Sequence, residues 1–470
     1  MNSAERLIAE LWEPTKVRRM AHEFADVAAD ELVGRAFAVR RPGASKRAAA
    51  LVEADRRVIG PVTLARRVQR ESLHLSHPRF LAQQVAAPIP AAALVESVVA
   101  AMNQSLAVWE MSPIATAIDR DLITRFKTLF GYPTSSEGSL VPGGALANLT
   151  ALLAARDTLD RDAHRTGKTR VAIIAGEQTH YSVTRAAKIL GFGSDAVFQV
   201  DPDRRFRTDP IAVTSSLARA KKAGFRNFVV VGSAGSTPTG SFDDLTELRR
   251  VATVEGAWLH VDAAHGGGLM FSRTYRRRLR GIRLADSIAF DPHKMMFMPL
   301  SAGCVLIRRG ADLRRSLAEQ ASYLFGSKRA WPDIGQVTIA CSQRFDALKV
   351  WLVWRAYGAK IWDALATHVC ELAHIAYRYC LQSPILEPLH KPDSNIFCFQ
   401  LRDRRNDAHS DRLHWELKEA LNESGFGYVS STVLGGRRVL RLVVMNPRTT
   451  SDEVRAVLDW IARRARRKRT

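Results

Sequence analysis

Residues 258–268 read WLHVDAAHGGG, a short apolar run that ends in Asp262 and is followed by small residues and a histidine. Residues 286–294 read DSIAFDPHK, a second apolar run whose polar end carries Lys294 directly after His293. Runs of this length and composition are typical of buried strands. We therefore predict two strands that present a carboxylate and an amine at their carboxyl ends, the edge at which open α/β sheets bind ligands.

The sequence around these two runs alternates between strand and helix patterns from about residue 90 to about residue 310. Apolar runs at Val171–Ala175, Phe228–Gly232 and Cys304–Ile307 are separated by helical patterns such as Ala145–Arg156 and Asp244–Glu255. Strands that alternate with helices of this length form crossover units in a mostly parallel sheet. The expected core is an α/β fold with three layers, α/β/α.

The two ends of the chain have different patterns. Residues 1 to about 75 show helical patterns without strand signals, as at Ala4–Leu11 and Val27–Phe37. After residue 340, a long helical pattern at Ala347–Ala364 precedes short strand patterns near Ile396–Leu401 and Val439–Val444. The expected units are a helical N-terminal segment (1–85), a large α/β domain (86–365) and a small α+β C-terminal domain (366–470).

The composition excludes several classes of protein. The chain has 470 residues, of which 46% are hydrophobic, and its apolar runs are too short to span a bilayer. The first residues lack the pattern of a secretion signal. The five cysteines are an odd number, lie far apart and form no CxxC pair. We expect neither a disulfide framework nor a metal site, and we expect a cytoplasmic protein.

The net charge of +22 raises the alternative of a nucleic-acid-binding protein, because Lys and Arg that neutralise phosphates give salt-dependent binding. Most of the excess is dispersed arginine, and the densest runs are Arg276–Arg280 and the tail Arg463–Arg469. The tail follows a helical pattern, and the dipole of a helix favours cations at its C-terminus. A solvated basic helix end explains the tail, so nucleic acid is not the expected partner.

Four segments together point to a pyridoxal 5′-phosphate (PLP) site. A buried carboxylate such as Asp262 requires a cationic partner, and a protonated pyridine nitrogen supplies one while keeping the ring an electron sink. The small residues after Asp262 would let a flat ligand approach closely. Gly143 and Gly144 precede an amphipathic helix whose free amides would receive a phosphate. His180 follows the run Val171–Ala175, where an imidazole can stack on a flat ring.

In the order and spacing of these segments, the chain resembles the group II PLP-dependent decarboxylases, the family of glutamate, aromatic-amino-acid and diaminobutyrate decarboxylases. The resemblance extends over most of the chain, with further matching stretches at His77–Phe80, Asn103–Ser105, Gly235–Thr237, Ala321–Phe325, Arg344–Trp351, Ser394–Asn395 and Arg441–Pro447. It implies a fold type I PLP enzyme, a carboxy-lyase that converts an L-amino acid to the amine and carbon dioxide. It also implies a tight homodimer with the active site built between the subunits.

By position, the resemblance implies three catalytic residues. Lys294 carries the cofactor as a Schiff base, Asp262 binds the pyridine nitrogen, and His180 stacks on one face of the ring. Ala264 packs on the other face, and Thr237 lies near the ring hydroxyl. The residues implied around the phosphate are Gly144, Ala145, Asp291 and His293.

The resemblance also implies two substrate-binding residues. Arg441 pairs with the α-carboxylate, and Gln83 falls where glutamate decarboxylases contact the distal carboxylate. The segments Ala321–Phe325 and Arg441–Pro447 are most similar to glutamate decarboxylase, so an acidic or short polar substrate is preferred. The sequence does not single out one amino acid: glutamate, aspartate, diaminobutyrate and aromatic amino acids all remain candidates.

Two positions depart from the pattern of the family. Ala145 stands where the phosphate loop usually has a serine, so one hydroxyl hydrogen bond of about 1 kcal/mol is absent. Residues 326–343 contain no tyrosine, whereas the mobile loop of the family usually offers one that protonates the substrate carbon after carbon dioxide leaves. Two outcomes stay open: another group protonates the carbon, or the reaction is diverted to transamination or to oxidative deamination that gives an aldehyde.

Overall fold

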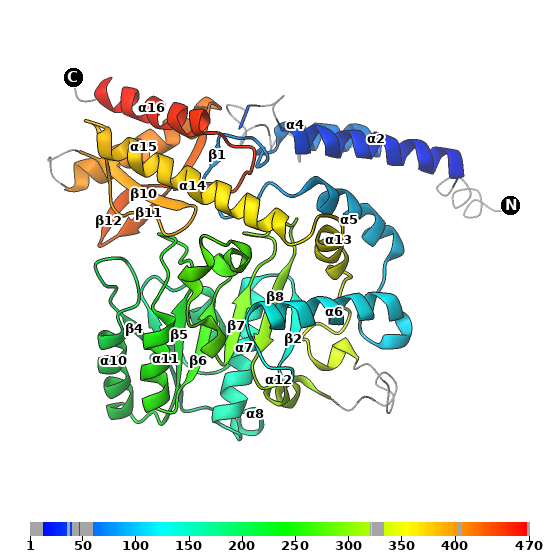
Figure 1. Cartoon of the computed structure of the whole chain (residues 1–470), viewed down its shortest axis with the longest axis vertical. Helices are drawn as coiled ribbons and strands as arrows, with labels where there is room; N and C mark the ends of the chain where they lie inside the picture. The colour runs from blue at the N-terminus through cyan, green and yellow to red at the C-terminus, as the bar shows by residue number, and fades with distance from the viewer. Residues whose placement is uncertain are drawn as a thin grey trace.

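A computed structural model describes residues 13–34, 38–39, 47, 60–319, 321, 333–402 and 407–467. Two sheets organise these residues, one of seven strands and one of five. Figure 1 shows the large sheet between layers of helices, with the smaller sheet and its helices above it and α2 (Pro14–Val33) projecting to one side. None of the helices in the described ranges is long and apolar enough to cross a membrane.

The large sheet is mostly parallel, with the order β2-β8-β7-β6-β5-β3-β4. All neighbouring strands from β7 to β4 run parallel, and β8 runs antiparallel to both of its neighbours. The strands are β2 (Glu137–Val141), β3 (Val171–Gly176), β4 (Val197–Val200), β5 (Asn227–Ser233), β6 (Trp258–Asp262), β7 (Ser287–Phe290) and β8 (Gly303–Ile307). This confirms the predicted α/β class.

Both faces of the large sheet are buried, which explains its continuous apolar runs. Successive side chains of β3 belong to different clusters, because they point to opposite faces of a strand. Ile173 packs in a cluster with α7 (Gly144–Leu159) and α9 (Ser182–Ile189), whereas Ile174 packs in the cluster that includes α10 (Pro210–Lys222) and α11 (Leu245–Val254). The alternation therefore produces the three layers.

The small sheet has the order β1-β11-β12-β10-β9. Its strands are β1 (Phe80–Leu81), β9 (Leu386–Pro388), β10 (Ile396–Leu401), β11 (Tyr428–Leu434) and β12 (Arg437–Val443). β1 pairs in parallel with β11, and the other pairs are antiparallel. Strand β1 thus joins the N-terminal part of the chain to a sheet formed by its C-terminal part. The domain limits stay a prediction, and the expected limit at residue 365 falls within α14 (Lys360–Gln382).

Two expected helices differ from the structure because glycines end helices. The helical pattern at Ala347–Ala364 is interrupted: α13 (Ala347–Tyr357) ends at Gly358, which has a φ of +69°, and α14 follows. In the N-terminal segment, α2 begins at Pro14 rather than at Val27 and ends before Gly34, which has a φ of +62°. The expected helix Ala4–Leu11 lies outside the described residues.

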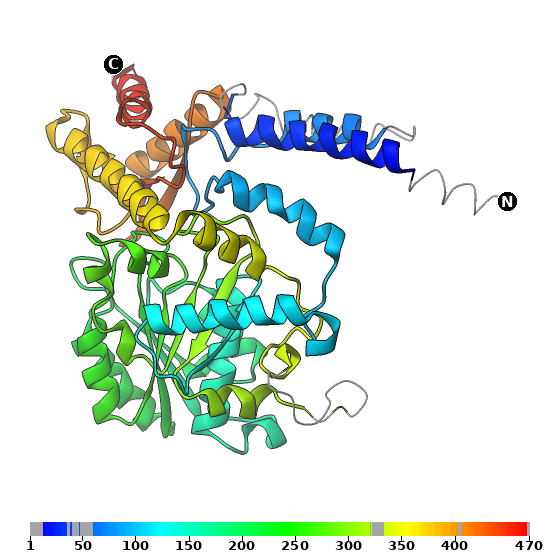
Figure 2. The ribbon, with the colours of Figure 1, turned by 45° about the vertical axis from the view of Figure 1, so that its right-hand side comes forward.

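The remaining helices are short or lie at the edges of the two sheets. They are α4 (Pro61–Glu71), α5 (Pro90–Met102), α6 (Pro113–Leu129), α8 (Ala163–Thr166), α12 (Gly310–Leu317), α15 (Asp407–Ser424), α16 (Ser451–Arg467) and the 3₁₀ turns η1 (Trp109–Met111), η2 (Ser194–Ala196), η3 (Gly266–Phe271), η4 (Arg276–Leu279), η5 (Ile282–Leu284) and η6 (Ile334–Gln336). Helices α2 and α4 contact each other and extend away from the body, as Figure 2 shows from a second side.

A buried tryptophan connects α14 to the loops after β6 and β7, which hold predicted site residues. Trp362 is fully buried, and its ring contacts the rings of Phe271 and Trp354. Its indole nitrogen donates a hydrogen bond of 2.9 Å to the carbonyl of Met296, two residues after Lys294. The loops after β6 and β7 are therefore held against α14, which limits the movement of the residues at the strand ends.

Candidate active site

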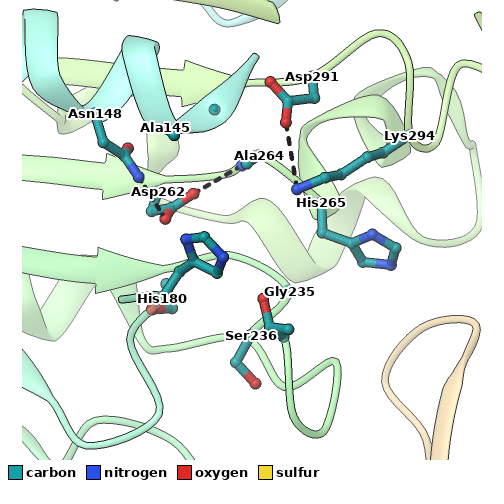
Figure 3. Close-up of a pocket in the computed structure, with 13 residues that line it drawn as sticks. Ala145, Asn148, His180, Gly235, Ser236, Asp262, Ala264, His265, Asp291 and Lys294 are labelled. Atoms are coloured by element: carbon teal, nitrogen blue, oxygen red, sulfur yellow. Dashed lines mark hydrogen bonds and ion pairs between the residues drawn. The ribbon is translucent and has the colours of Figure 1, made fainter. Parts of the chain in front are cut away.

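The carboxyl ends of β3, β5, β6 and β7 and the start of α7 surround a pocket (Figure 3). Strand ends from separate crossover units meet here because the strands are parallel. The pocket brings together eight residues that the sequence singled out: Gly144, Ala145, His180, Thr237, Asp262, Ala264, Asp291 and Lys294. Their individual roles toward a cofactor stay predictions.

Asp262 is a carboxylate held by neutral donors. It is 8% exposed, and its two oxygens accept hydrogen bonds from Asn148 Nδ2 at 2.8 Å and from the backbone N–H of Ala264 at 3.0 Å, drawn as dashed lines in Figure 3. Within the described part of the chain, no cation forms an ion pair with it. A buried carboxylate without a counter-charge is costly, so this oxygen pair requires a cationic ligand.

Lys294 lies in the turn after β7, and its Nζ is 3.3 Å from Asp291 Oδ2. The same oxygen is 3.4 Å from His293 Nε2. His293 Nδ1 accepts a hydrogen bond from the backbone N–H of Ala302, so the ring proton is on Nε2 and faces Asp291. Burial lowers the pKa of His293. His293 does not line the pocket, so the structure gives it contact with Asp291 rather than with the pocket itself.

His180 lies between β3 and α9, and its pKa is lowered mainly by burial. Its Nδ1 is 2.8 Å from Ser182 Oγ and also accepts from the backbone N–H of Ser182 at 3.3 Å. An acceptor Nδ1 leaves the ring proton on Nε2. The structure therefore presents a neutral imidazole with a defined tautomer on one side of the pocket, next to Asp262 in Figure 3.

The start of α7 supplies backbone donors. Its first residue is Gly144, and the preceding Gly143 provides no side-chain cap. The first amides of a helix lack intrahelical acceptors, and they suit an anion together with the helix dipole. A side chain at position 144 would not fit, because a Cβ there would lie 2.8 Å from Ala264 Cβ and 2.9 Å from Asp291 Oδ2. Close packing thus requires this glycine.

The glycines after Asp262 have a role that the sequence did not indicate. A Cβ on Gly267 would lie 2.6 Å from Phe290 Cβ, and one on Gly268 would lie 2.8 Å from Met295. These two glycines therefore allow η3 to pack on the β7 segment. Neither glycine lines the pocket, whereas Asp262, Ala264 and His265 of the same segment do, so the approach of a flat ligand to these small residues stays a prediction.

The structure does not place the two predicted substrate residues on the pocket wall. Arg441 lies on β12 and is 7% exposed, and it is close enough to His265, a lining residue, to lower the pKa of that imidazole. Gln83 is exposed after β1. Ser430 Oγ on β11 contacts the carbonyl oxygens of Ala82 and Arg441 at 2.8 and 3.1 Å, so β11 lies between the end of β1, which Gln83 follows, and the strand of Arg441.

The three comparisons with known proteins agree with this site. Residues 62–402 match the family model described as the pyridoxal-dependent decarboxylase conserved domain. The chain belongs to the pyridoxal-dependent decarboxylases. It is 33% identical over 409 residues to L-2,4-diaminobutyrate decarboxylase of Rhizobium meliloti (strain 1021), with 86% of this chain and 81% of the relative covered.

Other relatives of this decarboxylase show the same extent of similarity. Aromatic-L-amino-acid decarboxylase of Bacillus atrophaeus is 30% identical over 401 residues, with 84% of this chain and 82% of the relative covered. A crystal structure of mouse CSAD superposes with a TM-score of 0.89 at 25% identity, over 95% of this chain and 98% of that chain. The predicted family, the PLP cofactor, the carboxy-lyase activity and the fold type are confirmed.

The residues of the decarboxylase pocket fit PLP. The helix start at Gly144 suits its phosphate, the unpaired carboxylate of Asp262 suits a protonated ring nitrogen, and Lys294 supplies the amine. Asp291 carries a charge of the same sign as a phosphate, but Lys294 pairs with this charge and the neutral His293 ring donates toward it through Nε2. Of the segment without tyrosine, residues 326–332 lie outside the described residues, whereas 333–343 are described.

The sequence analysis gave no role to several polar groups in or behind the pocket, namely Asn148, Ser182, His260 and His265. Two of them carried a usable signal, because His260 and His265 stand close to Asp262 in the sequence, and His260 points to the same face of the strand as Asp262. Burial lowers the pKa of His260 to about 4. Asn148 and Ser182 come from distant segments and are recognisable only through their contacts.

Buried neutral histidines make the stability of the decarboxylase sensitive to acid. Burial lowers the pKa of His265 to about 3, whereas a histidine in an unfolded chain has a pKa near 6.5. Below pH 6.5 the unfolded chain therefore binds a proton that the folded chain does not, and the free energy of unfolding falls as the pH falls. We expect His265 to contribute about 2 kcal/mol of this loss between about pH 7 and about pH 4.5.

Urea denaturation of the wild type and of His265→Leu at these two pH values measures this contribution. The variant should lose less stability than the wild type over the interval, although it starts lower because Asn395 Oδ1 loses its donor at 2.7 Å. An equal loss in both proteins would contradict the assignment.

Proposed function

We propose that this chain decarboxylates an L-amino acid with an acidic or short polar side chain, with Lys294 as the residue that holds PLP. The observation that carries this proposal is the convergence of Lys294, Asp262 and His180, from three separate strand ends, on one pocket. The substrate class is supported by relatives named for diaminobutyrate, cysteine sulfinic acid and acidic amino acids.

Each residue has a task that its surroundings support. Bound PLP supplies an electron sink for the electron pair that is left when carbon dioxide departs. Asp262 provides the counter-charge that keeps the proton on the ring nitrogen. His180 presents a neutral ring face to the cofactor, because its ring proton is on Nε2 and its pKa is lowered. The first amides of α7 hold the phosphate.

Arg441 is the proposed partner of the substrate α-carboxylate. Its guanidinium is buried, Nε has no hydrogen-bond partner, and no carboxylate among the described residues forms an ion pair with it. Burial lowers the pKa of the guanidinium, although arginine still stays charged at neutral pH. A buried cation without an anion is unfavourable, and a planar carboxylate matches the fork of a guanidinium.

Gln83 is the proposed contact for the distal group of the substrate. The Ser430 hydroxyl on β11 contacts the carbonyls of both Ala82 and Arg441, so Gln83 and Arg441 lie on either side of this one residue. A neutral amide accepts or donates hydrogen bonds, which suits either a carboxylate or an ammonium group. This side chain is therefore compatible with both acidic and diamino substrates.

Replacement of Lys294 tests the cofactor assignment. We expect Lys294→Ala to lose the visible absorption band of bound PLP and to lower the rate of amine formation at least about 1,000-fold, as removal of a group that acts in the chemical step does. The matched control is Lys360→Ala, an exposed lysine at the start of α14, which should keep both. A Lys294→Ala protein that retains the band would refute the role of Lys294.

The products of the wild type decide between the two outcomes that the sequence left open. Glutamate, aspartate, cysteine sulfinate, diaminobutyrate and aromatic amino acids are supplied separately, and amine, carbon dioxide, aldehyde and hydrogen peroxide are measured by mass spectrometry and a peroxidase assay. One amine per carbon dioxide supports simple decarboxylation. Aldehyde with peroxide, or pyridoxamine phosphate, would show that the reaction is diverted.

Replacement of Arg441 tests the carboxylate site. Loss of one partner of a buried charge pair costs about 2–5 kcal/mol, so Arg441→Leu should lower kcat/KM by about 30-fold to 1,000-fold or more, mainly through KM. PLP affinity should change little. The control is Arg438→Leu on the same strand, which removes contacts with Trp415 and Ser431 only. Equal kinetic effects of the two changes would argue against a substrate contact.

We also propose a homodimer, with the active site at the subunit interface. Helix α5 exposes Leu94, Val98 and Met102, which are four residues apart and form one stripe, and α4 exposes Leu64 and Val68 in the same way. Neither α2 nor α4 has a buried residue. Exposed apolar stripes of this kind mark interaction surfaces, and a second copy of the chain would bury them.

The oligomeric state is measured by light scattering after size-exclusion chromatography. Val98→Glu should weaken self-association by at least about tenfold, because it places a charge in an apolar interface. Val254→Glu, an isolated exposed valine on α11, should leave association unchanged. A monomeric wild type would overturn the proposal.

We propose a cytoplasmic location as well. All five cysteines are free, and four of them are buried. Unpaired thiols are typical of a reducing compartment.

A further inference from the structure

One amide on α7 connects the two groups that face the ring of the cofactor. Asn148 is 1% exposed and lies one turn after Gly144. Its Nδ2 donates to Asp262 Oδ2 at 2.8 Å and to Ser182 Oγ at 2.9 Å, and its Oδ1 is 2.9 Å from His260 Nε2. All polar atoms of this side chain are therefore committed.

A series of buried, hydrogen-bonded side chains continues behind Asn148. His260 Nδ1 is 2.8 Å from Ser287 Oγ, which also accepts from Trp258 Nε1 at 2.8 Å. The geometry follows from the sheet, because Trp258, His260 and Asp262 alternate onto one face of β6 and the register pairs His260 with Ser287. The four side chains behind Asp262 are all buried.

The proton positions along this series are fixed by elimination. Both amide protons of Asn148 are used, so its Oδ1 accepts and His260 Nε2 carries the ring proton. The flipped amide would place its carbonyl against the Asp262 carboxylate, which is repulsive. Burial keeps His260 neutral, with a pKa of about 4, so Nδ1 accepts from the Ser287 hydroxyl. Every donor from Trp258 onward thus points toward Asp262.

A second branch reaches His180. Ser182 Oγ accepts from Asn148, so its own hydroxyl proton is free to donate to His180 Nδ1 at 2.8 Å. This contact, with the backbone N–H of Ser182, leaves the proton of His180 on Nε2. The amide of Asn148 therefore orients the Asp262 carboxylate and, at the same time, the Ser182 hydroxyl that contacts His180.

We propose that Asn148 is a positioning residue, supported by His260, that couples the carboxylate under the ring nitrogen to the imidazole on the ring face. The inference rests on the proposed roles of Asp262 and His180. Without the amide, Asp262 keeps the N–H of Ala264 as a donor, and the Ser182 hydroxyl is free to turn. The ring nitrogen then faces a carboxylate that is less well oriented, and the contact of 2.8 Å that orients the His180 ring is weakened, although the backbone N–H of Ser182 still donates to Nδ1.

The test uses PLP binding and the spectrum of the loaded enzyme rather than activity alone. Asn148→Leu has nearly the same shape but no amide. It should bind PLP about 10-fold to 100-fold more weakly, the range for loss of a supporting hydrogen bond to a charged functional group. The pH midpoint of the visible band should also shift. The control is Asn422→Leu, a buried asparagine of α15 bonded only to the backbone of Val429, which should lower the melting temperature without either effect.

Two substitutions at His260 test whether its hydrogen bond to Asn148 supports PLP binding. They remain informative even if Asn148→Leu does not fold. His260→Gln keeps an N–H near the position of Nε2, whereas His260→Leu removes it. The glutamine variant should restore PLP affinity to within about threefold of the wild type, and the leucine variant should resemble Asn148→Leu. Equal affinities of the two His260 variants would overturn the coupling.

Other outcomes separate this inference from the proposed function. If Asn148→Leu binds PLP within twofold of the wild type and its band has an unchanged midpoint, Asn148 is merely structural and the inference is wrong. If the wild type itself fails to bind PLP at Lys294, the proposed function is wrong, whatever the variants show.

Discussion

The arrangement of the site depends on one electrostatic constraint, the burial of the Asp262 carboxylate at the end of a central strand. Its neighbours in the described structure are neutral N–H donors, so the protein orients the charge without neutralising it. In the proposed function, a cationic ring nitrogen would complete the pair. The position of this carboxylate at the middle of a mostly parallel sheet explains why Lys294 and His180, from strand ends on either side of β6, face the same space.

Tight backbone packing makes this electrostatic arrangement rigid. Gly144 brings the start of α7 against Ala264 and Asp291, and Gly267 and Gly268 bring η3 against the β7 segment. Trp362 packs on Phe271 and donates a hydrogen bond to Met296, so it connects both loops to α14. At the three glycines, a side chain would not fit, so the strand ends are held at a fixed spacing. Small residues near the cofactor therefore serve packing as much as access.

In the proposed function, the cofactor and the substrate contact different sheets. The large sheet provides the groups that line the pocket, whereas Arg441 lies on β12 of the small sheet and Gln83 directly follows β1, which pairs with β11. Among the described residues, Arg441 is buried without an anion, as Asp262 is buried without a cation. The two proposed contacts would complement the two charges of an amino acid joined to a pyridinium ring.

The sequence by itself determined most strands of the large sheet, their polar ends and the glycines before α7, because these follow from local patterns of a few residues. It also identified Asp262, Lys294 and His180, since charged or ionisable groups at the ends of apolar runs are conspicuous. Only the tertiary structure decided that Asn148, 114 residues before Asp262, is the donor to that carboxylate, and which way its amide points. It also decided that Gly358 divides a helical pattern, that His293 faces Asp291, and that Ala82 contacts Ser430 of β11. These features depend on contacts between distant segments, and a hydrogen-bond partner is specified by position in space rather than by spacing along the chain.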